Sequence, residues 1–155
     1  MSAPNMSAYT KSKLLAEEAA WNFINTIPTK GPYHKIELVT LLPGFVVGKC
    51  IATGRNTSTS VIKQFLQGEI DYIPKKQVSI VDVEDVAIAH LRACTVEKAA
   101  GHRIIISANT VWLSDIAKIL HDEFHSFNYE IVHAETSLFF IKLASYFSSE
   151  AAQVL

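Results

Sequence analysis

The spacing of apolar and polar side chains predicts a chain in which helices and short strands alternate. Residues 7–27 carry apolar side chains at helical intervals and are followed by Pro28, so they are predicted to form one long helix. Its predicted apolar face consists of Leu14, Ala20, Trp21, Phe23, Ile24 and Ile27. Residues 36–42 are apolar on both faces and end at Pro43, which is typical of a strand buried in a parallel sheet.

The same pattern continues through the rest of the chain. A second helix is predicted over about 59–67 with Gly68 as its stop, and a short strand over 78–81. Asp82 and Asp85 resemble an N-terminal capping box for a helix that buries Val86, Ala89, Leu91 and Ala93. A central parallel strand is predicted over 103–107, a helix over 114–124, a short strand over 130–133 and helical structure from residue 137 onward. This alternation predicts an α/β fold.

Between residues 44 and 57 the pattern predicts a loop rich in small side chains. The loop follows the carboxyl end of a predicted parallel strand, which is where ligands bind in open α/β sheets. The sequence therefore predicts a ligand site there.

Composition and charge narrow the possible functions. The chain has 155 residues, of which 49% are hydrophobic, and a net charge of −1 with no cluster of Lys or Arg, so neither disorder nor a nucleic-acid partner is expected. Two distant cysteines indicate a reducing compartment. No run approaches the ~18 apolar residues of a membrane span, and residues 1–7 lack an apolar core, so a soluble cytoplasmic protein without a membrane partner is expected.

The candidate chemistry lies at the start of the first predicted helix. Tyr9 and Lys13 are four residues apart, so the phenol and the ammonium project from one helical face about 6 Å apart along the axis. A nearby cation favours the phenolate form of a tyrosine, which suits it to general acid–base work. A carbonyl group that receives a hydride needs such an acid.

Three segments in order resemble the extended short-chain dehydrogenase/reductase family, which includes sugar-nucleotide epimerases and dehydratases. They are residues 9–17, 37–48 and 81–90, and they look most like dihydroflavonol reductases and cinnamoyl-CoA reductases. The resemblance implies that Tyr9 protonates the substrate oxygen during hydride transfer and that Lys13 binds the nicotinamide ribose. It also implies NADP(H) or NAD(H) as cofactor and a small carbonyl compound as substrate.

The resemblance extends to further cofactor contacts. Pro43, Gly44, Phe45 and Val46 look like the turn whose backbone meets the nicotinamide carboxamide, and Ser58 aligns with a serine that contacts cofactor. The residues alone leave alternatives open. Pro43 and Gly44 are equally typical of a strand-ending turn, and Ser58 of a helix cap.

The family's glycine-rich phosphate turn and its catalytic serine or threonine precede the tyrosine helix, whereas eight residues precede Tyr9 here. The resemblance therefore implies the C-terminal half of a Rossmann-like parallel sheet with a small, mostly helical substrate subdomain. Residues 1–110 are assigned to the dinucleotide-binding domain, with inserted elements, and 111–155 to part of a substrate-binding cap. We expect the C-terminal portion of a carbonyl or aldehyde reductase that is inactive alone and that can self-associate through exposed sheet edges.

Two other functions remain open. A nucleotide-sugar epimerase or dehydratase fragment would use the same tyrosine and lysine, and a non-catalytic binding or scaffold protein could retain half of the fold. A zinc site is not expected: His121 and His125 share a helical face, but Asp122 stands where the zinc-protease motif needs Glu, and no third ligand is evident. No metal is therefore predicted.

Overall fold

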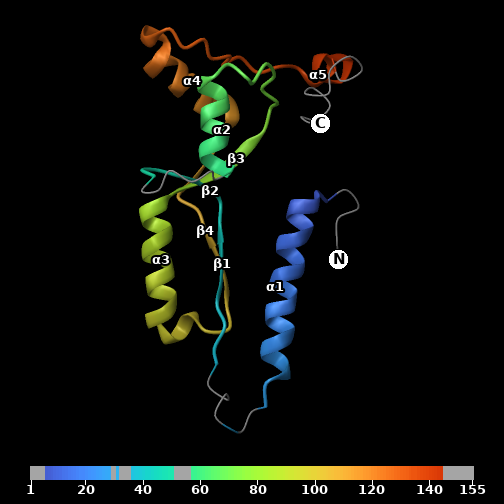
Figure 1. The fold of residues 1–155 in the computed structure, drawn as a ribbon, viewed down its shortest axis with the longest axis vertical. Coiled ribbons are helices and arrows are strands. Elements are labelled where there is room, and N and C mark those ends of the chain that lie inside the picture. The colour runs from blue at the N-terminus through green and yellow to red at the C-terminus, as the bar shows by residue number, and fades with distance from the viewer. Residues whose placement is uncertain (1–5, 29–30, 32–35, 51–56, 145–155) are drawn as a thin grey trace. The chain divides into compact units, whose positions relative to one another are not determined.

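The structure, a computed structural model, describes residues 6–28, 31, 36–50 and 57–144 (Figure 1). The chain forms two compact units, one made of 1–42 with 88–105 and the other of 43–87 with 106–155. The predicted domains, 1–110 for cofactor binding and 111–155 for substrate binding, are defined by function and not by compactness. They stay a prediction.

Helix α1 (Ala8–Thr26) begins where the sequence predicts. The Ser7 hydroxyl caps it by accepting a hydrogen bond of 3.1 Å from the Thr10 amide. The half-buried stripe on this helix consists of Leu14, Glu17, Ala20, Trp21 and Ile24. Phe23 was predicted to face inward and is 63% exposed, so that assignment is wrong. No residue of α1 is fully buried.

Strands β1 (Thr40–Pro43) and β4 (Arg103–Ile106) form a two-stranded sheet and lie side by side in Figure 1. The Thr40 amide donates to the His102 carbonyl and the Gly44 amide to the Ile106 carbonyl, each at 3.0 Å. The chain advances four residues from Thr40 to Gly44 and four, in the same direction, from His102 to Ile106. The two strands are therefore parallel, as predicted. Among the described residues β4 pairs only with β1, and Ile105 is 76% exposed, so the prediction of a central strand over 103–107 is wrong.

A second sheet has β3 (Gln77–Asp82) in its centre, with β2 (Phe45–Val47) parallel to it and β5 (Asn109–Trp112) antiparallel. The predicted loop after Gly44 is therefore wrong at its start, because β2 occupies residues 45–47. Residues 51–56 of that predicted loop lie outside the described part. Strand β5 was not predicted at all, and it makes this sheet mixed.

Helix α3 (Val83–Thr95) follows β3 directly. The Asp82 carboxylate accepts a 2.7 Å hydrogen bond from the Glu84 amide, which confirms the predicted capping role of Asp82. Val86, Ala89 and Ala93 are half-buried, whereas Leu91 is 67% exposed and was wrongly assigned to the interior. A short 3-10 helix, η1 (Glu97–Ala99), comes next and buries Ala99.

The core of the second unit lies between helices α2 (Thr57–Leu66) and α4 (Leu113–Phe124). Its fully buried side chains are Phe65, Ile73, Ala117 and Ile131, and partly buried apolar residues pack around them. Gly68 follows α2 with φ of +66°, a left-handed conformation that glycine adopts without strain. Its predicted role as the end of this helix is confirmed.

The segment after α4 is largely irregular. It contains a 3-10 helix, η2 (His125–Phe127), and helix α5 (Leu138–Ala144). The strand predicted over residues 130–133 is absent there; instead Ile131 is buried, and an isolated bridge joins Ile73 to Glu135. Of the helices in the described ranges, none has the length and hydropathy needed to cross a bilayer.

Candidate active site

Tyr9 and Lys13 lie together on the first two turns of α1. The Lys13 ammonium is 5.4 Å from the centroid of the Tyr9 ring, and the Tyr9 side chain is 65% exposed. Neither side chain forms a hydrogen bond or ion pair with another described residue. A phenol donor and a cation therefore reach solvent side by side, with their hydrogen-bonding capacity available for a ligand.

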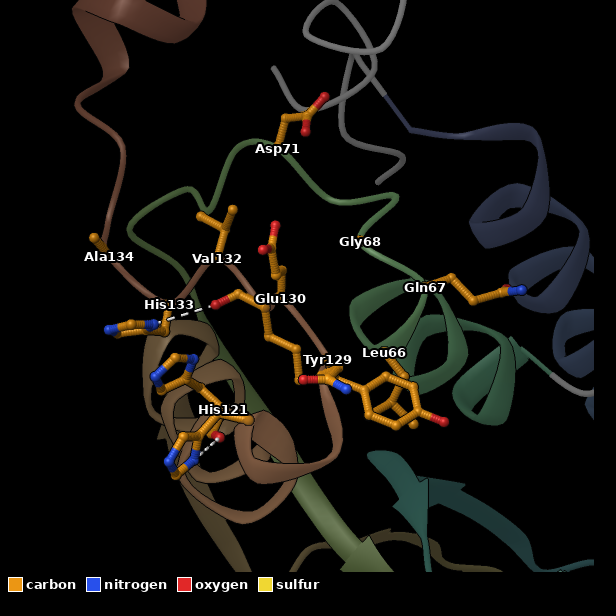
Figure 2. Close-up of a pocket in the computed structure, with 13 residues that line it drawn as sticks. Leu66, Gln67, Gly68, Asp71, His121, Tyr129, Glu130, Val132, His133 and Ala134 are labelled. Carbon is orange, nitrogen blue, oxygen red and sulfur yellow. Dashed lines mark hydrogen bonds between the residues drawn. The ribbon is translucent and has the colours of Figure 1, made fainter.

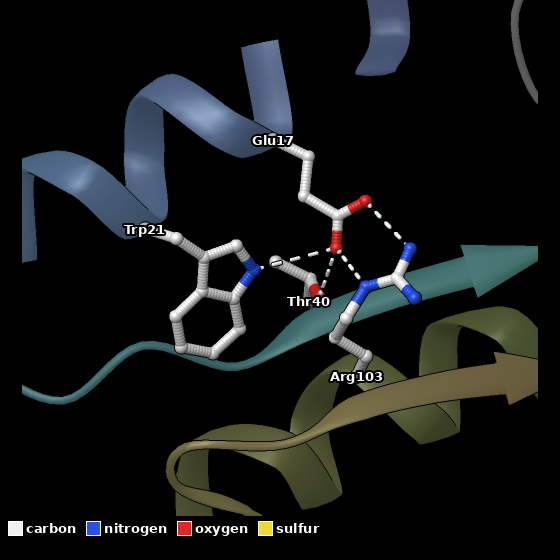
Figure 3. A network of polar contacts seen from close by, with 4 residues as sticks. All are labelled: Glu17, Trp21, Thr40 and Arg103. Carbon is white, nitrogen blue, oxygen red and sulfur yellow. Dashed lines mark hydrogen bonds and ion pairs between the residues drawn. The ribbon is translucent and has the colours of Figure 1, made fainter. Parts of the chain in front are cut away.

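A polar network holds α1 against strands β1 and β4 (Figure 3). Arg103 donates to both carboxylate oxygens of Glu17, from Nε to Oε1 at 2.6 Å and from Nη2 to Oε2 at 2.9 Å. The Thr40 hydroxyl donates to Oε1 at 2.9 Å and the Trp21 indole N–H at 3.4 Å. The Glu17 side chain is 14% exposed.

These donors decide the charge state of Glu17. The Arg103 hydrogen bonds, followed by the Thr40 hydroxyl, lower the pKa of Glu17 from 4.5 to about 2. In return, the Glu17 carboxylate raises the pKa of Arg103. The pair is therefore fully ionised at neutral pH, and it fixes the helix one turn beyond Lys13.

The segment Pro43 to Val46 connects the two sheets. Pro43 ends β1, and Gly44 bonds through its amide to Ile106 on β4. A Cβ on Gly44 would overlap the carbonyl oxygen of Ser79 on β3, so only glycine fits without a shift of backbone. Packing against Ser79 by itself therefore requires glycine at position 44.

Phe45 and Val46 lie on a strand that has one unpaired backbone edge among the described residues. Strand β2 is the edge of its sheet within the described residues, because its only partner there is β3. In a strand the N–H and C=O of one residue point to the same side and those of the next residue to the other side, so one of Phe45 and Val46 presents both groups away from β3. An edge donor and acceptor together fit a carboxamide, and the exposed phenol and ammonium of Tyr9 and Lys13 fit a ribose and a carbonyl oxygen. By donor and acceptor type, the groups of each unit are compatible with the nicotinamide end of NADP(H).

Ser58 is half-buried in the first turn of α2. The helix already begins at Thr57, so Ser58 lies inside it and not at the cap position that the sequence offered as an alternative. The residues just ahead of the helix are outside the described part of the chain.

The structure brings some predicted site residues together and leaves others in separate units. Tyr9 and Lys13 are neighbours in the first unit, and Pro43, Gly44, Phe45, Val46 and Ser58 all belong to the second. The cofactor roles of all seven stay predictions.

An open groove of about 1120 Å³ lies elsewhere in the second unit, between the end of α2, the end of α4 and residues 128–134. Figure 2 shows His121 and His133 side by side on its wall. Their ring centroids are 4.1 Å apart, and those of His121 and His125 are 5.5 Å apart. Nδ1 of His121 is buried and has no hydrogen-bond partner among the described residues.

Sequence reasoning missed the association of His133 with His121. The spacing of 12 residues crosses η2 and an irregular segment, so no periodic signal links the two histidines. Within the ranges that the structure covers, no three His, Cys, Asp or Glu side chains are arranged to hold a metal ion.

Known proteins of similar sequence identify the family of this chain. No protein-family model matches the chain. The NADPH-dependent methylglyoxal reductase GRE2 of Saccharomyces cerevisiae is 32% identical over 125 residues, a match that covers 77% of this chain and 36% of that protein. Cinnamoyl-CoA reductase CAD2 of Medicago truncatula is 31% identical over 118 residues, covering 76% of this chain and 33% of that protein.

The solved structure of another reductase has a fold similar to that of this chain. Gre2 of Candida albicans in complex with NADPH superposes with a TM-score of 0.64 at 30% identity, covering 82% of this chain and 38% of that one. This agreement confirms the predicted α/β, Rossmann-like fold class. The chain spans about a third of the length of the curated relatives it matches. Its homologues are reductases of the extended short-chain dehydrogenase/reductase family, and the resemblance predicted from the sequence is confirmed.

Proposed function

We propose that this chain carries the proton-donating part of an NADP(H)-dependent reductase that acts on a small carbonyl or aldehyde substrate. The single observation that carries the proposal is the contact between Tyr9 and Lys13, 5.4 Å from ammonium to ring centroid on an exposed helix face. The names of the relatives support it, since one is an NADPH-dependent methylglyoxal reductase and another a cinnamoyl-CoA reductase.

In this proposal each residue has a defined task. When bound, the nicotinamide supplies the hydride that reduces the substrate carbon. Tyr9 donates its phenolic proton to the carbonyl oxygen, which prevents an alkoxide from accumulating. The Lys13 ammonium stabilises the phenolate that remains. It also donates hydrogen bonds to the oxygens of the ribose hydroxyls.

The second unit would hold the nicotinamide ring. The outward-facing backbone N–H and C=O of Phe45 or Val46 would bond the carboxamide, and the Ser58 hydroxyl would add one further contact. Pro43 and Gly44 would fix the direction in which β2 leaves β1.

We further propose that catalysis needs the parts of the relatives that this chain does not match. The relatives are about three times as long as the matched region. The sequence contains no Gly-x-x-Gly-x-x-Gly turn, and such a turn lets the backbone approach a pyrophosphate at a helix N-terminus. The 155-residue chain by itself is therefore proposed to be inactive.

A hybrid protein tests the proposal. The chain is joined to the part of the yeast GRE2 reductase that it does not match, and NADPH-dependent reduction of methylglyoxal is measured. Tyr9→Phe is expected to lower kcat at least about 100-fold, because it removes the general acid and keeps the ring.

The matched control is Tyr129→Phe, which removes a phenol from an exposed tyrosine without a lysine four residues on. Its kcat should stay within about twofold of the parent hybrid, as for an ordinary surface change. Full turnover by the Tyr9→Phe hybrid, or no turnover by a hybrid that binds NADPH, would contradict the proposed role.

A further inference from the structure

Lys13 has two potential partners on its own helix, one turn away in each direction. Tyr9 precedes it by four residues and Glu17 follows it by four, so all three side chains lie along one row of α1. A lysine and a glutamate at this spacing normally attract each other. The ammonium could therefore contact either the ring or the carboxylate.

The structure shows only one of these contacts. The Lys13 ammonium lies over the Tyr9 ring, and among the described residues Glu17 forms its ion pair with Arg103, not with Lys13. Arg103 engages both carboxylate oxygens from strand β4, as Figure 3 shows, and Thr40 and Trp21 donate to Oε1 as well. A planar guanidinium matches both oxygens of a carboxylate at once, which a lysine ammonium does not.

We propose that Arg103 is a positioning residue for the Tyr9–Lys13 pair: by holding Glu17 against the sheet, it withholds that carboxylate from Lys13 and leaves the ammonium at the Tyr9 ring. The inference rests on the proposed function for the catalytic role of the pair. The placement of the three side chains is independent of that role.

The proposal makes opposite predictions for the two partners of the ion pair. Arg103→Gln leaves Glu17 charged but without its ion-pair partner, so the carboxylate can attract Lys13 and the contact with Tyr9 should weaken. Glu17→Gln breaks the same ion pair but removes the competing carboxylate, so the contact with Tyr9 should persist. A role of the ion pair in helix stability alone predicts that both substitutions have the same effect.

Proton NMR of the 155-residue chain, without cofactor or substrate, measures the contact. The Tyr9 ring should shift the ε-methylene protons of Lys13 upfield, since the ammonium lies 5.4 Å from the ring centroid, and Tyr9→Leu supplies the baseline without a ring. Exposed cation–π contacts and i,i+4 ion pairs are similar in strength, so Arg103→Gln should lower this shift about twofold. Glu17→Gln and the double variant Glu17→Gln with Arg103→Gln should retain it.

Circular dichroism of each variant checks that the helix content of the chain is unchanged. Arg103→Lys, which keeps a cation beside Glu17, should preserve most of the shift. An unchanged shift in Arg103→Gln would overturn the proposal, as would an equal loss in Glu17→Gln. Because the readout involves no turnover, either result leaves the reductase proposal to be judged by the hybrid enzyme alone.

Discussion

The carbonyl oxygen of Ser79 occupies the space in which a side chain on Gly44 would lie. Ser79 belongs to β3 and Gly44 to the junction between β1 and β2, so a backbone atom and not a movable side chain blocks the position. No left-handed conformation is involved at Gly44, since its φ is not positive. The need for glycine at this junction is therefore one of space.

Gly44→Ala should destabilise the chain by at least about 2 kcal/mol, because backbone must shift to admit the methyl group. Urea unfolding measures the change in free energy. Gly101→Ala is the matched control, since a Cβ there meets nothing within 4 Å and the φ of +76° is its only strain. That control should cost about 1 kcal/mol, and equal costs for both variants would contradict the steric account.

The stability of the chain should depend on the ionisation of Glu17. Its pKa is lowered to about 2 by Arg103 and Thr40, from 4.5, so the ionised form stabilises the folded state. This contribution is complete above about pH 4.5 and disappears as the pH falls through 2. Glu17→Gln should therefore lower Tm at pH 6, and the difference from the parent should narrow steadily toward pH 2.

Glu18→Gln is the control for that titration. Glu18 is the exposed neighbour of Glu17 on α1, and it forms no ion pair with another described residue. Its substitution should change Tm little at any pH between 2 and 6. A parallel pH dependence in the two variants would assign the effect to general charge and not to the Arg103 pair.

Phe65 is the largest side chain in the core between α2 and α4, and it is 1% exposed. Phe65→Ala should reduce the free energy of unfolding by about 3–5 kcal/mol through lost burial and the cavity it leaves. Phe127→Ala removes the same atoms from a side chain that is 69% exposed and should cost less than about 0.5 kcal/mol. Chemical denaturation of both variants compares them, and similar costs would mean that Phe65 is not a core residue.

The 155-residue chain should bind NADPH weakly. In the proposed function only the nicotinamide end of the cofactor would find partners, because the sequence has no glycine-rich phosphate turn, and the charged phosphates would stay in water. Nicotinamide fluorescence should show no saturation below about 10 µM chain. Saturable binding at micromolar concentration would reveal a phosphate site that the proposed function does not include.

The chain alone should self-associate through its short parallel sheet. Strands β1 and β4 pair only with each other in the part of the chain described, and Ile105 is 76% exposed on β4. Sedimentation velocity should show a mass that rises with concentration, and Ile105→Lys should reduce it. Ile119→Lys, at a 67% exposed position on α4, should leave it unchanged if the sheet is the interface.

Local signals in the sequence were sufficient for helices α1 to α4. Ser7, Gly68 and Asp82 predicted helix ends correctly, because each acts on backbone groups within a few residues. The four-residue spacing of Tyr9 and Lys13 likewise predicted that both lie on one face of α1, because that spacing is close to one helical turn. The ordered family segments added the reductase resemblance, which the relatives confirm.

The strands and the side-chain orientations were less predictable. Strands β2 and β5 are three and four residues long, too short for a periodic pattern, and they exist through pairing with β3. Phe23 and Leu91 were expected inside from their hydrophobicity, yet which face of a helix is covered depends on what packs against it.

The sequence by itself determined the family, the helices and the spacing of the candidate catalytic pair, since these depend on residues that are near one another along the chain. Only the tertiary structure decided that Arg103 meets Glu17 across 86 residues, that His133 joins His121, and that Ser79 leaves no room at Gly44. Such contacts form between segments whose proximity is set by folding, and no local pattern encodes them.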